Sequence, residues 1–275
     1  PPVKIVMPPP PPRIITPPSS TSTDLTKLYA RLEREFLTRG LMRTDGGGPD
    51  TPFTDTQLAR NFVRIALFDE YVSEGDLLRA RATATELSRW DRPVRVSVEF
   101  GKSVPMDQRP KDTTAVAKYV DRLARVTGHP IAMSDTNPNF HVMFWNEDDR
   151  LGSAARLNDL LPDIAPSSMR AILGLPAEQL CVVVGVFDAG KSTYSKAVAV
   201  IRGEHPDLLR KSCIHEEIAQ GLGLRNDSPK ARPSIFNDDD EFARLTSHDE
   251  KLLQMLYDRR LRVGMSAEEA RPAIE

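Results

Sequence analysis

The chain has 275 residues, of which 40% are hydrophobic and 28% charged, and its formal net charge is -2 at pH 7. These values are ordinary for a globular protein. They exclude the global basic field that would attract nucleic acid or an anionic membrane surface. No apolar run approaches the ~18 residues of a membrane-spanning helix. Because the chain begins Pro-Pro-Val, we expect a processed or truncated product, from which any signal peptide or lipid-anchor cysteine has been removed.

Residues 1–23 form a proline-rich arm, with consecutive prolines at 8–12. Proline lacks the backbone N–H and fixes φ, so neither a helix nor an inner strand is expected here. The proline run should adopt polyproline II. The arm is either a spacer to a membrane anchor or a surface for a protein partner, and we favour the partner.

The segment 24–90 is predicted to be helical. Helices are expected at 24–42, 56–67 and 74–90. In the first of them, Leu28, Leu32, Phe36 and Leu37 recur at helical spacing. Strong turn formers at 43–52 separate this helix from the next one.

Residues 91–275 alternate between strand-like and helix-like patterns. Val94, Val96, Val98 and Phe100 alternate with other residues, which is typical of a strand. Strands are expected at 92–101, 139–146, 181–187 and 196–203, and helices at 115–128, 205–224 and 247–258. We expect Ser247 and Glu250 to form the capping box of the last helix. This order of elements predicts one α+β domain.

A phosphate-loop pattern, G-x-x-x-x-G-K-[ST], occurs from Gly185 to Ser192. Such a loop must open a helix whose N-terminus binds the phosphates. The residues that follow, 196–203, are instead β-branched and alternating, so we expect a strand hairpin with a turn at Asp188–Lys191. Nucleotide binding at Gly185–Ser192 therefore stands only as a second alternative function.

The two cysteines, Cys181 and Cys213, do not form a metal-type C-x-x-C pair. They are either buried free thiols or a disulfide. We favour the disulfide, because other features place the chain outside the cytoplasm. A bond between them would stabilise the fold by on the order of 3 kcal/mol.

The stretch 216–227 resembles the zinc motif of metzincin proteases, H-E-x-x-H-x-x-G-x-x-H. A register that begins at His215 places alanine at the second ligand position. A register that begins at Glu216 places Gly223 at the turn glycine, so we adopt it. The resemblance then implies that Glu216, Gln220 and Asn226 occupy the three metal-ligand positions. It also implies that Glu217 occupies the position of the general base.

Downstream residues extend the resemblance. Metzincins follow the zinc helix with a turn that carries a methionine, and here Phe236 of Ser234-Ile235-Phe236 stands at that position. The segments 213–229, 233–258 and 261–272 resemble the bacterial family catalogued as domain of unknown function 2927. Members of that family are similar to secreted proteins or lipoproteins, and the family has no established activity.

These substitutions bear on the chemistry of the site. Zinc sites are built from histidine, cysteine and carboxylate, so Gln220 and Asn226 are poor zinc donors. One carboxylate with two amides suits calcium better, and only weakly. Without a bound metal, Glu217 has no activated water to deprotonate. The alternative for Glu216, Glu217 and Gln220 is a solvated helix face. The acidic run 237–241 is either a calcium site or, as we prefer, a solvated loop.

We therefore predict an α+β, zincin-like (metzincin-like) domain over 91–275, with a mixed sheet, preceded by helices and the proline-rich arm. The favoured function is that of a non-catalytic pseudo-metalloprotease, periplasmic or secreted, that binds protein partners through the arm and the relic cleft. No nucleic-acid partner and no cofactor are expected. Membrane contact is expected only through a removed lipid anchor. The alternative is a metallopeptidase with an atypical zinc or calcium site at Glu216, Glu217, Gln220 and Asn226.

Overall fold

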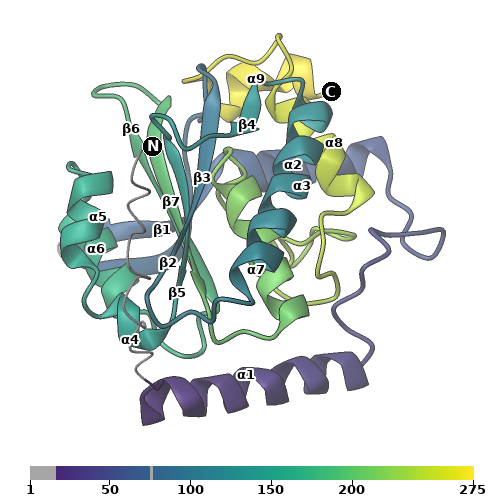
Figure 1. The fold of residues 1–275 in the computed structure, drawn as a ribbon. Coiled ribbons are helices and arrows are strands. Elements are labelled where there is room, and N and C mark those ends of the chain that lie inside the picture. The colour runs from purple at the N-terminus through teal and green to yellow at the C-terminus, as the bar shows by residue number, and fades with distance from the viewer. Residues whose placement is uncertain (1–16, 75–76) are drawn as a thin grey trace, which may run out of the picture.

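The computed structural model describes residues 17–74 and 77–275 of the chain. The polyproline II prediction for 8–12 lies outside these residues. The fold is built around a five-stranded sheet with helices on both faces (Figure 1). Among the described residues, no helix is long and apolar enough to cross a membrane.

The sheet is mixed, with the order β4-β3-β5-β7-β6. Its strands are β3 (Val94–Phe100), β4 (Ile131–Met133), β5 (Phe140–Trp145), β6 (Cys181–Phe187) and β7 (Tyr194–Arg202). The pairs β3–β4, β3–β5 and β5–β7 are parallel, whereas β6 runs antiparallel to β7. Every side chain of the central strand β5 is buried, as expected for a strand that is covered on both faces. The expected mixed sheet and α+β class are therefore confirmed.

Two helical layers enclose the sheet. One face packs against α3 (Arg109–Thr127) and α7 (Asp207–Gln220), with α8 (Ser247–Leu256) and α9 (Ala267–Ile274) beyond them. The other face packs against α5 (Ala154–Leu160) and α6 (Pro166–Leu173), which follow the short α4 (Glu147–Arg150). Figure 1 shows these two layers on opposite sides of the strands.

Two helices precede the sheet. Helix α1 (Ser20–Thr38) begins four residues before the predicted start, because Ser19 caps it by accepting a hydrogen bond from the Ser22 amide. The predicted apolar stripe is partly wrong, since Leu28 and Leu37 are 43% and 48% exposed. Tyr29 takes the central buried position of α1 instead. Helix α2 (Asp55–Ala66) agrees with the predicted 56–67 and joins the main core.

The helix predicted at 74–90 is wrong. Strands β1 (Phe68–Glu74) and β2 (Leu77–Ala84) form an antiparallel pair there. Strand β2 packs against α6, so a tertiary contact overrides the helix propensity of its alanine and leucine residues. The side chains of Leu87 and Trp90, which follow the pair, are buried in the main core. The core is therefore continuous across residue 90.

The hairpin predicted for 181–203 is present. Strands β6 and β7 are joined by a turn in which the Lys191 amide donates to the Asp188 carbonyl over 3.0 Å. Gly190 supplies the positive φ of 68° that this turn uses. The phosphate-loop pattern thus leads into a strand, and the helix N-terminus that would bind phosphates does not follow it.

The capping box of α8 lies one residue earlier than predicted. Thr246 and Asp249 form it, not Ser247 and Glu250. Thr246 is fully buried, and its hydroxyl also donates to the Pro233 carbonyl over 2.9 Å. Tertiary hydrogen bonds therefore select Thr246 over its exposed neighbour as the N-cap.

Candidate functional site

A glycine turn ends α7 and positions the residues of the metzincin-like motif. The helix predicted to end at 224 ends at Gln220, and Gly221 caps it. Gly223 then adopts a φ of +130°, and a Cβ at this position would lie 2.3 Å from the carbonyl oxygen of Ser88. Only glycine fits such a conformation and such a close approach. The predicted role of Gly223 as a turn residue therefore has a physical basis here.

Glu216, Glu217 and Gln220 lie on the last turns of α7 and line a cavity of about 710 Å³. Strand β6 forms one wall of this cavity, and α6 and the start of β1 contribute to its rim. The Glu217 side chain is 4% exposed, and its Oε2 atom has no hydrogen-bond partner among the described residues. The motif therefore places a buried carboxylate oxygen at a cleft.

Asn226 does not join this group. Its side-chain amide donates to the Arg64 carbonyl over 2.8 Å, and its backbone amide donates to the Ile65 carbonyl over 3.1 Å. Gln220 is also engaged, because its amide donates to Asp227 Oδ1 over 3.2 Å. The spacing in the sequence predicted these two amides as metal ligands, but both amide groups donate hydrogen bonds to other residues of the chain.

Zinc does not fit this donor set. Zinc takes nitrogen, thiolate and carboxylate donors, whereas Gln220 and Asn226 offer only neutral amide oxygens, which are poor zinc donors. Across residues 17–74 and 77–275, no group of three histidine, cysteine, aspartate or glutamate side chains is arranged to hold a metal ion. We therefore derive no metal-dependent step for this site.

The cleft is strongly acidic, which the motif alone did not predict. Burial raises the pKa of Glu216 well above its usual value, and the charges of Glu217 and Asp240 raise it further. Burial likewise raises the pKa of Glu217, with the charges of Asp227 and Glu70 adding to the effect. Each of these carboxylates therefore makes ionisation of its neighbours less favourable.

The additional acidic residues come from distant parts of the chain. Asp238 and Asp240 belong to the acidic run 237–241, which we interpreted as a solvated loop. Both are exposed and both line the cleft, whereas Asn237 at the start of the run is buried. Glu70 comes from β1, a strand that begins between the predicted helices at 56–67 and 74–90. The clustering of three acidic residues at 238–240 was the available signal, although its proximity to α7 was not visible in the sequence.

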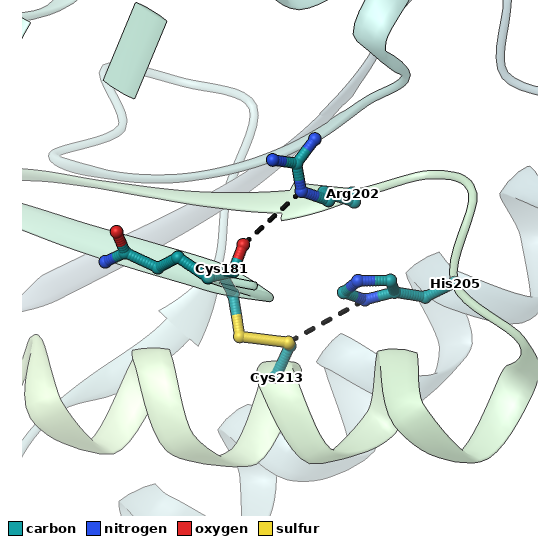
Figure 2. Close-up of a disulfide and its surroundings, with 5 residues drawn as sticks. Cys181, Arg202, His205 and Cys213 are labelled. Carbon is teal, nitrogen blue, oxygen red and sulfur yellow. Dashed lines mark hydrogen bonds between the residues drawn. A yellow bond between two sulfur atoms is a disulfide. The ribbon is translucent and has the colours of Figure 1, made fainter. Parts of the chain in front are cut away.

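A disulfide joins the two walls of the cleft. Cys181 of β6 and Cys213 of α7 are bonded, with Cα atoms 5.9 Å apart, as predicted. Figure 2 shows His205 directed at this bond, with Nδ1 3.8 Å from the Cys213 sulfur. Burial lowers the pKa of His205 well below its usual value, so this imidazole is neutral. Both cysteines are less than 9% exposed. The disulfide thus fixes the edge strand to the helix that carries the carboxylates.

A buried polar network supports the turn beneath the cleft. Asp249 accepts hydrogen bonds from the Ser234 hydroxyl over 2.5 Å and from the Ile235 amide over 3.1 Å. It also accepts from the amide and hydroxyl of Thr246. Phe236, at the position compared with the metzincin methionine, is fully buried. This network holds the 234–236 turn against the start of α8.

His215 lies on another side of α7 and does not reach the cleft. Its ring stacks on Tyr119 with the ring centroids 3.9 Å apart, and its Nδ1 accepts the Leu245 amide over 3.0 Å. Burial, together with the charges of Arg122 and Arg244, lowers its pKa to about 3. The rejected register, in which His215 would be the first metal ligand, therefore points away from the site.

The comparisons with known proteins give a family without an assigned activity. A family model described as "Protein of unknown function (DUF2927)" matches residues 55–275. No curated protein matches the chain. No solved structure matches it either.

Proposed function

The chain belongs to the DUF2927 family, and we propose that it is a non-catalytic protein whose cleft binds an extended segment of a protein partner. The observation that carries this proposal is the 710 Å³ cavity between β6 and the carboxylates of α7. Cavities of about 300–1,000 Å³ are typical of ligand sites. The cavity therefore has the size of a binding site, although its residues lack the donors of a zinc centre.

The outer edge of β6 supports an extended ligand. In the described sheet, β6 pairs only with β7 and forms the edge. Successive strand residues point to opposite faces, yet the consecutive residues 181–185 all line the cavity. The cavity therefore follows the strand edge rather than one face. An exposed edge can add a peptide strand through backbone hydrogen bonds.

The order of elements supports descent from a zinc protease. A strand, a helix and further strands precede the antiparallel edge strand β6, and β7 follows it before the site helix and its turn glycine. This is the arrangement that the metzincin resemblance implies. In such a scaffold, amides at 220 and 226 replace the metal ligands, while the binding cleft remains.

The disulfide supports a location outside the cytoplasm. Disulfides form and persist in oxidising compartments and are rare in reducing ones. We place the protein in the periplasm or in the secreted fraction on this ground. The proline-rich segment that precedes α1 would supply a second contact with a partner, because proline-rich segments are common recognition motifs.

The test combines metal analysis with peptide hydrolysis. Protein purified without chelator is analysed for zinc and other metals, and its activity on casein is compared with that of Glu217→Gln. We expect less than about 0.1 metal ion per chain and equal background hydrolysis, because a structural or catalytic zinc site would be close to fully loaded. Near-stoichiometric zinc with hydrolysis that depends on Glu217 would refute the non-catalytic assignment.

A further inference from the structure

We infer that the cleft recognises a lysine or arginine side chain of the bound segment, which the carboxylates of Glu216 and Glu217 receive. This inference rests on the proposed function and adds the chemical identity of the residue that is recognised. Its support comes from the charge of the cavity, from an unsatisfied buried oxygen, and from the apolar wall beside it.

Acidic side chains exceed basic ones around the cavity. The basic residues of the described lining are Arg170 and Arg225, and Arg225 is paired with Asp69 over 2.6 Å. The same lining also holds the acidic residues Glu70, Glu178, Glu216, Glu217, Asp238 and Asp240. A low-dielectric cleft of one charge sign attracts ligands of the opposite sign. The complementary ligand is therefore a cation.

Glu217 supplies the most specific part of the argument. Its Oε2 atom is buried and lacks a partner among the described residues, while the residue lines the cavity. A buried polar atom without a hydrogen bond costs about 1–3 kcal/mol. An ammonium or guanidinium donor would satisfy this oxygen and would favour the ionised forms of Glu216 and Glu217. The ligand must therefore bring hydrogen-bond donors as well as positive charge.

A divalent metal ion fits less well. No three carboxylates or histidines of the described residues are arranged to hold one. Calcium and magnesium need about six oxygen ligands in close array. A guanidinium can instead bridge separate carboxylates, because its five N–H donors are spread over a planar fork.

The cavity also has room for the aliphatic stem of such a side chain. Leu180 and Val183 line it and remain partly exposed. Lysine and arginine bury their methylene stems against apolar surface while their heads reach polar groups. A peptide along the seven residues of β6 would span about 20 Å and could direct one side chain toward α7.

The experiment selects peptides from a random library of extended segments on the whole, disulfide-bonded protein. Parallel selections use wild type, the double variant Glu216→Gln/Glu217→Gln, and Glu178→Gln as the matched control. Glu178 is an exposed carboxylate at the rim of the same cavity. We expect lysine or arginine at one fixed position of the peptides that wild type and Glu178→Gln select. We expect no such preference with the double variant.

A second measurement tests the charge directly. One selected peptide is synthesised with citrulline in place of arginine, or norleucine in place of lysine, and binding is followed by fluorescence anisotropy. We expect affinity for wild type to fall by about tenfold or more and affinity for the double variant to change little. Peptides selected without a basic residue would overturn this inference and leave peptide binding intact. Recovery of no peptide would overturn both, and displacement of the peptide by Ca²⁺ or Zn²⁺ would assign the carboxylates to a metal instead.

Discussion

Replacing Glu217 with glutamine should stabilise the free protein at neutral pH. Burial and the charges of Asp227 and Glu70 raise the pKa of this carboxyl well above its usual value. The folded state then binds more protons than the unfolded state above about pH 4.5. The free energy of unfolding therefore falls as the pH rises from about 4.5 toward the pKa that Glu217 has in the folded state. Glutamine has nearly the same shape and carries no charge, so it removes this loss.

The magnitude follows from the difference in bound protons between the folded and unfolded states. The free energy of unfolding falls by about 1.36 kcal/mol for each pH unit over which the folded state holds one more proton than the unfolded state. Between the model-compound value of 4.5 and pH 7, the cost cannot exceed about 3.4 kcal/mol. We expect Glu217→Gln to raise the free energy of unfolding by up to that amount, and Tm by about 2–4 °C for each kcal/mol.

The assay is thermal and urea unfolding of wild type, Glu217→Gln and the control Glu178→Gln, each at pH 5 and pH 7.5. The gain for Glu217→Gln should be larger at pH 7.5 than at pH 5, whereas Glu178→Gln should change stability by less than about 0.5 kcal/mol. A Glu217→Gln protein that is less stable than wild type at pH 7.5 would refute the reasoning. In that case the carboxylate would have a stabilising partner.

Three further predictions concern the disulfide, two glycines with positive φ and a carboxylate of β3. Replacing both cysteines of the disulfide with alanine should lower the free energy of unfolding by about 3–4 kcal/mol. Urea titration measures this loss, and an unchanged midpoint would argue that the bond is not formed. Gly223→Ala should cost about 3 kcal/mol or more, because the new Cβ meets a carbonyl oxygen. Gly190 also has a positive φ, but a Cβ there would meet no atom within 4 Å, so Gly190→Ala should lower the free energy of unfolding by only about 1 kcal/mol. Equal losses for the two glycine variants would contradict the steric argument. Glu99 has a pKa lowered to about 2, first by its hydrogen bond with His141. Its stabilisation is present above about pH 4.5 and is lost as the pH falls toward 2, so Glu99→Gln should flatten acid unfolding curves over that range.

Local patterns were sufficient for the elements that pack in the sheet. The strands at β3, β5, β6 and β7 follow from alternating or continuous apolar residues, because each lies in or beside the core. The pattern failed at β2, whose alanine, leucine and arginine residues favour a helix. Packing of β2 on α6 decides its structure. The Gly75-Asp76 pair in the sequence was nevertheless a turn signal that argued against a helix across 74–77.

The candidate site shows the same division between local and long-range information. Spacing alone identified Glu216, Glu217 and Gly223, because one helix and its turn carry them. Spacing misplaced Asn226, whose partners on α2 lie about 160 positions away in the chain. The acidic partners of the cleft were also hidden, since Glu70 comes from β1 and Asp238 from a loop. Contacts of this kind depend on the tertiary fold and leave no periodic trace in the sequence.

The carboxylates of α7 lower the stability of the free protein. This effect distinguishes a role in ligand binding from a role in stabilising the fold. A residue retained for stability should lose stability when it is neutralised, and its effect on binding should follow that loss. Glu217 should do the opposite. Its neutralisation removes a buried charge whose formation is disfavoured and should raise stability, while it removes the negative charge that receives a basic side chain and should weaken binding. Buried polar groups that lower stability are characteristic of binding sites that are completed by a ligand. If Glu217→Gln instead weakened stability and binding together, the carboxylate would be part of the fold, and the cleft would need another reason for its charge.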